Sequence, residues 1–600
     1  MQTRKFSFVL SIVLIAAMLF GCSPATTAAP EATKAPEATT APVATTAPEA
    51  TKAPEATSAP EATAAPTEAA AATCTTSDAV LNGGTILNAF TINFNPFANN
   101  PNWPTVKGIF EPLMVYNTLK SEMVPWLAES YTWSADFKTL TFKLRSGVKW
   151  SDGEPFTAKD VVFTFDLLKK TPGLAGSGLN ALNGAVDTFT APDDLTVVFT
   201  LKTVDTVSIY DIANQDIVPE HIWKDVTDPT TFTNDKPVGT GPFTELVDFQ
   251  TQVYELDKNP NYWQECKPAY KGLRVTAYSG NEAQVAAFID GQIDWAGTVL
   301  PNVDEAVIAH NANISFNPNS STMTVLMHLN PNTKPFEDVV FRKAMSTAIN
   351  RDQIVEVAFN GKAAASDVTG LSDAYKTYKV ADPSALGDWT TYNPEKAAQM
   401  LEDAGYKLGA DGFRTLPDGS PLALKLTMVQ GFTDWISAGE IMVQNWKDVG
   451  INVETNMIDA GAFFGSVPMG DYQIALWFGY TSPTPYGQFL KMMGSATVVP
   501  WGQFTMVNFA HYGNTDADTQ LAEFASTTDQ AKQIEAAHKL QQIFADQAPV
   551  IPLWSGLDWG IFNNEFFTGW PTPENNYSLA FPQGAIDPEQ LIVMLTVKPK

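Results

Sequence analysis

The chain is poor in the side chains on which metal centres and many catalytic sites depend. Its 600 residues include only five histidines and three cysteines. The histidines are spread along the sequence at His221, His310, His328, His511 and His538. None of the usual motifs for zinc, calcium, a nucleophilic serine or a nucleotide phosphate occurs. We therefore expect no metal, no cofactor and no catalytic residue, and the many acids give glycosidase chemistry no specific support.

Positive charge is scarce as well. The sequence has 37 lysines and arginines against 65 aspartates and glutamates, which gives a formal net charge of -28. Such a chain disfavours nucleic acid and other polyanions, and nothing in it resembles a basic stripe. The charge fits solubility outside the cell better than it fits a dedicated acidic binding surface.

The apolar run near the start, Phe6 to Phe20, is short for a membrane span, which needs about 20 residues. Arg4 and Lys5 precede it and Gly21 follows, a pattern typical of a secretory signal, so we predict a signal peptide over 1–21. An uncleaved signal anchor is the alternative. The next segment, 22–73, is almost only Ala, Pro, Thr and Glu, with APEAT recurring every six residues. Without large apolar side chains it should be a disordered tether.

The body runs from Cys74 to Lys600, long enough for two or three lobes. An apolar content of 44% supplies side chains for sizeable cores. Cys74 and Cys266 can oxidise in an exported protein, so a disulfide between them and two free thiols both remain open. Helices alternate with short β runs along the body, which predicts an α/β fold.

One stretch, Leu140 to Asp166, predicts a strand, a turn, a short strand and a helix that begins after Thr157. Its string LRSGVKWSDGEPFTAKDVVFTF resembles the signature of the family 5 solute-binding proteins of ABC importers, which take dipeptides, oligopeptides, nickel or oligosaccharides. Further similar segments are Pro237–Phe243, Asn259–Trp263, Phe341–Arg351, Pro394–Tyr406 and Ala548–Trp554. At the start, Leu19 to Cys22 resembles the lipobox of bacterial lipoproteins, which implies an acyl group on Cys22.

The resemblance implies the periplasmic-binding-protein type II fold, with two main α/β lobes joined by two crossing segments and an extra lobe inserted into the first. Mapped onto this chain, lobe I is discontinuous over 78–116, 238–327 and 556–600. The inserted lobe covers 117–237 and lobe II covers 328–555.

The resemblance also implies a binding protein and not an enzyme. It would be a monomer held by its lipid on the extracytoplasmic face of the cell membrane, either extracellular or periplasmic. Closed around a ligand, it would deliver that ligand to an ABC permease with ATPase subunits. A secreted hydrolase and a ligand sensor remain rivals from other classes.

Aromatic side chains are plentiful, with 15 Trp, 16 Tyr and 36 Phe, and their rings suit sugar faces and peptide side chains alike. Three loop segments carry the candidates: Asn93–Phe97 with Trp103, Gly431–Trp435, and Trp477–Gly487. The predicted ligand contacts are Asn95, Phe97, Trp103, Trp435, Trp477, Tyr480, Tyr486 and Trp554.

The segment from Trp477 to Gln488 contains no acid, whereas peptide-binding relatives carry an aspartate near this place that pairs with the peptide ammonium. A buried ammonium without a carboxylate is costly. This segment and Gly569 to Tyr577 resemble the oligosaccharide-binding branch of the family. We therefore favour an oligosaccharide ligand, keep a peptide as the alternative, and place a nickel chelate third because histidines are few.

Overall fold

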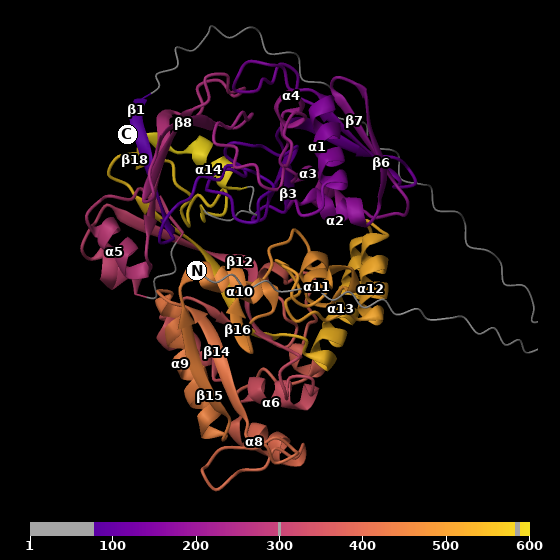
Figure 1. Ribbon diagram of the computed structural model, residues 1–600, viewed down its shortest axis with the longest axis vertical. Helices are drawn as coiled ribbons and strands as arrows, with labels where there is room; N and C mark the ends of the chain where they lie inside the picture. Colours follow the sequence, from indigo (N-terminus) through magenta and orange to yellow (C-terminus); the bar gives the residue numbers. More distant parts are fainter. Residues whose placement is uncertain (1–76, 298–301, 583–588) are drawn as a thin grey trace, which may run out of the picture. The chain divides into compact units, whose positions relative to one another are not determined.

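The computed structural model describes residues 77–297, 302–582 and 589–600 (Figure 1). The predicted signal peptide, the tether, Cys22 and Cys74 lie outside these residues. Within the described ranges, no helix combines the length and the apolarity that a membrane span needs. Thr73–Lys600 forms one unit by its backbone contacts.

One large mixed sheet organises the body. Its described strands follow the order β15-β14-β16-β12-β17-β11-β1-β10-β9-β8, with β13 paired to β17. Their bounds are β1 Ser77–Ile86, β8 Phe243–Phe249, β9 Val253–Lys258, β10 Tyr270–Tyr278, β11 Trp295–Ala296, β12 Ile314–Leu329, β13 Ala364–Ala365, β14 Ala423–Val429, β15 Asn452–Ile458, β16 Ile474–Trp477 and β17 Ile551–Asn563. We call β1 to β11 with their helices the β1 half, and β14 to β16 with theirs the β14 half.

Two long strands join the halves. β12 and β17 pair in antiparallel fashion from Ile314 opposite Asn563 to Met327 opposite Ile551. Their register shifts between Ser320 and Thr324, midway along the pair. Such an irregularity bends a strand and weakens local pairing, so a hinge between the halves would lie here.

The β1 half also holds a second sheet, in the order β4-β5-β7-β6. Its strands are β4 Ala128–Trp133, β5 Thr139–Leu144, β6 Val186–Asp193 and β7 Thr196–Leu201; the hairpin β2 Met114–Asn117 and β3 Glu122–Pro125 lies beside it in sequence. The predicted strand and helix are confirmed by β5 and by α1 (Ala158–Lys170). Thr157 and Asp160 form the predicted capping box, and Phe165 packs against Phe199 with ring centroids 4.9 Å apart.

Most described helices belong to the β14 half, drawn largely in orange in Figure 1. They are α6 Val339–Thr347, α7 Arg351–Phe359, α8 Pro394–Asp403, α9 Thr433–Asp448, α10 Ala460–Ser466, α11 Pro485–Met493, α12 Thr515–Ala525 and α13 Gln530–Gln547, with the short helices η2 Asp373–Tyr375, η3 Pro383–Leu386, η4 Val467–Met469 and η5 Ser495–Thr497. The β1 half has α2 Gly178–Asn183, α3 Ser208–Ala213, α4 Glu220–Trp223, α5 Asn281–Ile289, η1 Asp304–Ile308 and α14 Gln590–Thr596, with the strand pair β18 Phe567–Thr568 and β19 Lys598–Pro599.

Each half has its own large apolar core. One core draws on residues from Val325 to Trp554, and the other on residues from Leu81 to Trp295 and from Phe562 to Val597. The predicted division into lobes, with its boundaries, stays a prediction. The predicted α/β class is confirmed.

Two buried titratable groups shape these cores. Glu111 accepts hydrogen bonds from Trp126 Nε1 at 2.7 Å, Tyr262 Oη at 2.9 Å and Trp263 Nε1 at 2.9 Å, and burial raises its pKa to about 7. His328 on β12 is fully buried, its ring nitrogens have no hydrogen-bond partner among the described residues, and burial lowers its pKa to about 3. The Glu111 carboxylate therefore links separate segments of the chain by hydrogen bonds, whereas the His328 ring packs in the core as an apolar ring would.

Candidate ligand-binding site

A cavity of about 340 Å³ lies where strands of both halves end. β1 ends at Ile86 and β10 at Tyr278, while β14 ends at Val429 and β15 at Ile458. The described lining residues are Ile86, Leu87, Asn88, Ser279, Gln430, Gly431, Asp459 and Ala460. β1 runs parallel to β10 and β14 runs parallel to β15, so the cavity meets the carboxyl ends of both pairs. This is the edge at which open α/β sheets bind ligands.

The halves touch at one side of this cavity through two glycines. A Cβ built on Gly280 would lie 3.1 Å from Gly431 O and 3.2 Å from Gly431 Cα. Gly431 has a φ of +94°, a conformation that side-chain-bearing residues rarely adopt. The Asn281 backbone N–H donates to Gly431 O at 3.3 Å, and Asn281 Nδ2 donates to Thr433 Oγ1 at 3.1 Å. Backbone therefore meets backbone where the two halves close.

An aromatic surface adjoins the cavity in the β14 half. We call Phe432, Phe464 and Phe478 the phenylalanine face, since all three are half-buried. Phe464 and Phe478 stack with centroids 6.5 Å apart at 13°, and Phe432 meets Phe478 at 6.3 Å. Phe432 directly follows the cavity residue Gly431, and Phe464 lies on α10, which starts at the cavity. Rings that keep part of a face exposed can cover apolar patches of a ligand.

Two of the predicted contact residues lie behind this face. Trp435 is 3% exposed and packs on Phe478 with centroids 4.8 Å apart, while Trp477 is 5% exposed and meets Phe464 at 5.4 Å. Both tryptophans therefore support the phenylalanine face from within. Trp554 is buried on β17 and packs against Phe359 at 5.0 Å.

Three further predicted contacts lie in the loop that follows β1. Asn95 is buried, and its Nδ2 donates to the carbonyl oxygens of Pro229 at 2.8 Å and Phe232 at 2.9 Å. Phe97 is also buried, whereas Trp103 is half-buried and its indole N–H donates to Gln590 Oε1. Among the described residues that line the cavity, none is one of these three. Their role as ligand contacts stays a prediction.

Tyr480 and Tyr486 complete the predicted set. Tyr480 is buried, and its hydroxyl accepts the Asn508 N–H at 2.9 Å. Tyr486 is half-buried at the start of α11 and lies 5.9 Å from Phe524 between ring centroids. Of the predicted contacts, Tyr486 thus keeps a partly exposed ring, as Trp103 does.

The sequence located two of the segments that contribute to this site, Gly431–Trp435 and Trp477–Gly487. The half-buried aromatic residues in them are Phe432, Phe478 and the predicted Tyr486, whereas Trp435, Trp477 and Tyr480 are buried. Phe464 on α10 was not anticipated. The signal that could have found Phe432 and Phe478 is their place after neighbouring parallel strands: Phe432 follows β14, which ends at the cavity, and Phe478 follows β16, which pairs with β14.

No group of three or more His, Cys, Asp or Glu side chains that could hold a metal ion occurs among the described residues. Cys266 is disulfide-bonded. Because Cys74 lies outside the described residues, its pairing with Cys266 stays a prediction.

Known proteins with similar sequences and structures place this geometry in context. The family described as bacterial extracellular solute-binding proteins, family 5 middle, matches residues 122–501. A Brucella ovis protein named for peptide binding in an ABC transporter is 31% identical over 322 residues, which cover 53% of this chain. The match spans 59% of that protein's length. A glutathione-binding protein from Pectobacterium atrosepticum is 27% identical over 446 residues, covering 73% of this chain and 79% of its own.

Among solved structures, a periplasmic oligopeptide-binding protein from Thermotoga maritima with bound mannohexaose superposes with a TM-score of 0.80. It is 28% identical and covers 87% of this chain and 99% of its own. This likeness confirms the predicted periplasmic-binding-protein type II fold.

Proposed function

Because this chain belongs to family 5 of the bacterial extracellular solute-binding proteins, we propose that it captures a solute between its two halves for an ABC permease. The observation that carries this proposal is the cavity at the carboxyl ends of β1, β10, β14 and β15, which takes its lining from both halves. A ligand held there touches both halves at once. Binding then favours the closed arrangement, since a ligand shifts a conformational equilibrium by its extra affinity for one state.

The chain binds its solute without changing it. The lipid on Cys22 holds it at the membrane, the 22–73 tether supplies reach, and the closed form is what the permease recognises. The bend at the β12–β17 register shift allows the halves to part and release the solute.

We propose an oligosaccharide as the solute. The phenylalanine face offers rings that cover the apolar faces of sugars, and Gln430 and Asn88 offer amides at the cavity. The segment Trp477–Gln488 has no carboxylate for a peptide ammonium, and the similar Thermotoga maritima protein is described with mannohexaose bound. A peptide is the second candidate, favoured by the names of the Brucella ovis and Pectobacterium atrosepticum proteins.

A thermal-shift screen of the purified chain tests both solutes. It compares mannohexaose, cellohexaose and maltohexaose with di- and tripeptides and with glutathione. A ligand at 100 times its dissociation constant should add about 2.7 kcal/mol to the free energy of unfolding. Chromatography of the recovered ligand should show it unchanged, because released products would indicate a hydrolase. Stabilisation by peptides and by no sugar would make the sugar preference wrong while leaving the binding function in place.

A further inference from the structure

Four half-buried tyrosines lie at a second place where the halves meet. Tyr116 on β2 and Tyr210 on α3 belong to the β1 half, whereas Tyr378 and Tyr486 belong to the β14 half. The halves are in contact here too, since the Thr206 N–H, just before α3, donates to the carbonyl oxygen of Ala525 at the end of α12 at 2.8 Å. These tyrosines therefore occupy a boundary and not the core of one half.

The rings form one neighbourhood. Tyr116 and Tyr210 meet edge to face with centroids 5.4 Å apart, and Tyr378 and Tyr486 each lie 5.9 Å from Phe524. Burial raises the pKa of Tyr210, and the nearby Tyr116 and Tyr378 hydroxyls raise it further. Tyr116 Oη also donates across the boundary to the Pro483 carbonyl oxygen at 3.4 Å. Residues from both halves thus come together in this cluster.

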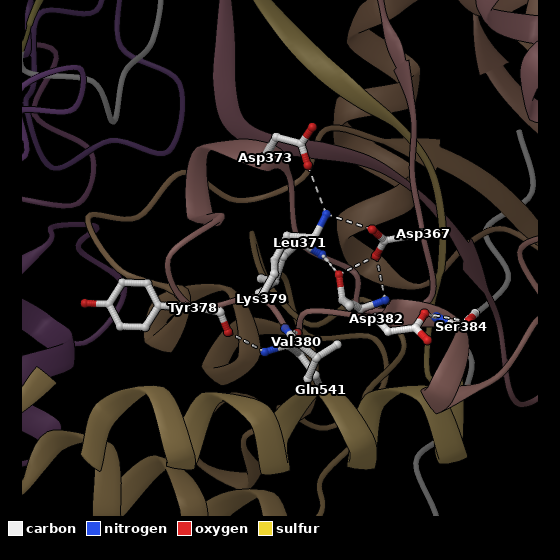
Figure 2. Close-up of polar contacts among 10 residues, drawn as sticks. Asp367, Leu371, Asp373, Tyr378, Lys379, Val380, Asp382, Ser384 and Gln541 are labelled. Atoms are coloured by element: carbon white, nitrogen blue, oxygen red, sulfur yellow. Dashed lines mark hydrogen bonds and ion pairs between the residues drawn. The ribbon is translucent and has the colours of Figure 1, made fainter. Parts of the chain in front are cut away.

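Polar contacts hold the backbone around Tyr378 (Figure 2), and its ring packs against Phe524. The buried Gln541 side chain donates to the Tyr378 carbonyl oxygen at 2.8 Å and accepts the Val380 N–H at 3.0 Å. Next to it, Lys379 Nζ lies 2.7 Å from Asp367 Oδ2 and 3.0 Å from Asp373 Oδ1. Figure 2 shows the Tyr378 ring pointing away from these contacts. The backbone is therefore held on α13 while the ring projects from the β14 half.

Two charged groups of opposite sign accompany the tyrosines. Asp211 lies on α3 and Lys491 on α11, and both are half-buried. Burial raises the pKa of Asp211 to about 6 and lowers the pKa of Lys491, and in each case the opposite charge of the other residue offsets part of the effect. Their side-chain hydrogen bonds to described residues are long, at 3.4 Å from Asn180 Nδ2 to Asp211 Oδ1 and 3.4 Å from Lys491 Nζ to Thr481 O. Both groups thus keep capacity for further hydrogen bonds, and Asp205 places a second carboxylate near Asp211.

We propose that Tyr116, Tyr210, Tyr378 and Tyr486 form a subsite for one uncharged sugar ring, completed only when the halves come together. This proposal rests on the proposed function and names the ligand chemistry at the second place where the halves meet. Tyrosine faces bury the C–H side of a pyranose, while their hydroxyls, the Asp211 carboxylate and the Lys491 ammonium bond its hydroxyl groups. An anionic ligand group would face the carboxylates of Asp205 and Asp211, whereas an uncharged sugar ring needs only hydrogen bonds from these groups.

Calorimetric titration of mannohexaose, cellohexaose and maltohexaose into the wild-type chain and its variants tests the subsite. Tyr210→Ala and Tyr378→Ala, one from each half, should each weaken sugar binding on the order of tenfold. Tyr378→Phe keeps the ring and should stay within about threefold of wild type. The matched control is Tyr392→Ala, because Tyr392 is 39% exposed on the β14 half. It should bind as wild type does.

Nitration by tetranitromethane provides a readout that needs no variant. Bound sugar should protect Tyr210 and Tyr378 from nitration, measured by peptide mass spectrometry, and should leave Tyr392 unprotected.

The outcomes separate the two proposals. If the wild type binds sugar, yet both alanine variants bind equally well and no tyrosine is protected, the subsite is wrong and the proposed function stands. If the wild type binds peptides but no sugar, the sugar preference and the subsite are both overturned. If it binds neither class, the proposed function fails and the subsite with it.

Discussion

Gly280→Val should hold the two halves apart without harming either of them. The φ of Gly280 is 170°, which is extended backbone that valine adopts without strain. The obstacle lies in the other half, because a Cβ on Gly280 would stand 3.1 Å from Gly431 O and 3.2 Å from Gly431 Cα. Both neighbours are backbone atoms and cannot rotate aside as a side chain can. The valine therefore penalises only the arrangement in which the halves are in contact.

The size of the effect follows from overpacking. Forcing extra methyl groups into a filled contact costs roughly 1–3 kcal/mol, and the two γ-carbons of valine come closer still than its Cβ. At 1.4 kcal/mol for each factor of ten, ligand affinity should fall roughly 5- to 150-fold. Gly280→Ala adds the Cβ alone and should lie at or below the lower end of this range. The free energy of unfolding should change little, because the half that carries Gly280 can open away from Gly431.

Titration calorimetry with the ligand found by the screen measures this loss, and small-angle scattering should show a larger radius of gyration with ligand present. Gly465→Val on α10 is the matched control, since among the described atoms beyond its own helix a Cβ there meets none within 4 Å. It should bind and scatter as the wild type does. Wild-type affinity in Gly280→Val, with unchanged scattering, would refute the idea that this contact belongs to the ligand-bound arrangement.

Other predictions concern two buried core residues, His328 and Glu111, and the disulfide bond of Cys266. Burial lowers the pKa of His328 from 6.5, its value in the unfolded chain, to about 3 in the folded protein. As pH falls from 6.5 toward 3 the unfolded chain therefore takes up the proton first, and the free energy of unfolding decreases. His328→Leu should remove about 4–5 kcal/mol of this decrease, measured by urea titrations at several pH values in this range. An unfolding free energy that depends on pH as it does in the wild type would contradict this expectation. Glu111→Gln turns an amide N–H₂ toward buried donors and should cost about 1–3 kcal/mol, measured as a lower melting temperature. A non-reducing digest should yield one linked peptide that contains Cys74 and Cys266, and a different partner for Cys266 would overturn that pairing.

Local elements of this fold follow from local sequence. Thr157 and Asp160 predict the start of α1, because a capping box depends on only four neighbouring residues. The pairing of β12 with β17 could not be predicted in the same way, because Ile314 and Asn563 are far apart in sequence and alternation does not name a partner strand. The resemblance to a family supplied what local patterns could not, namely that two segments cross between lobes.

Local sequence was also insufficient to predict which side chains of the site face outward. The loops that reach the cavity were predictable because they follow strands, yet which of their rings face outward depends on how neighbouring rings pack. Trp435 and Trp477 bury the most apolar area when they turn inward, so they lie behind Phe432 and Phe478. Asn95 illustrates a second limit, because backbone groups can occupy the side chain of a polar loop residue: its Nδ2 donates to two carbonyl oxygens and its Oδ1 accepts the Phe97 N–H.

The two places where the halves meet should respond differently to substitution, because the contact at each of them acts in a different way. The Gly280–Gly431 contact involves no ligand atom, so a change there alters the population of the closed form and should weaken every ligand by one common factor. The Tyr378 ring would touch the ligand itself, so a change there should weaken ligands that place a sugar ring against it and spare shorter ones that do not reach it. A series of mannose oligomers of increasing length separates these effects. The Gly280→Val loss should be independent of length, whereas the Tyr378→Ala loss should appear only once the oligomer is long enough to reach the tyrosines.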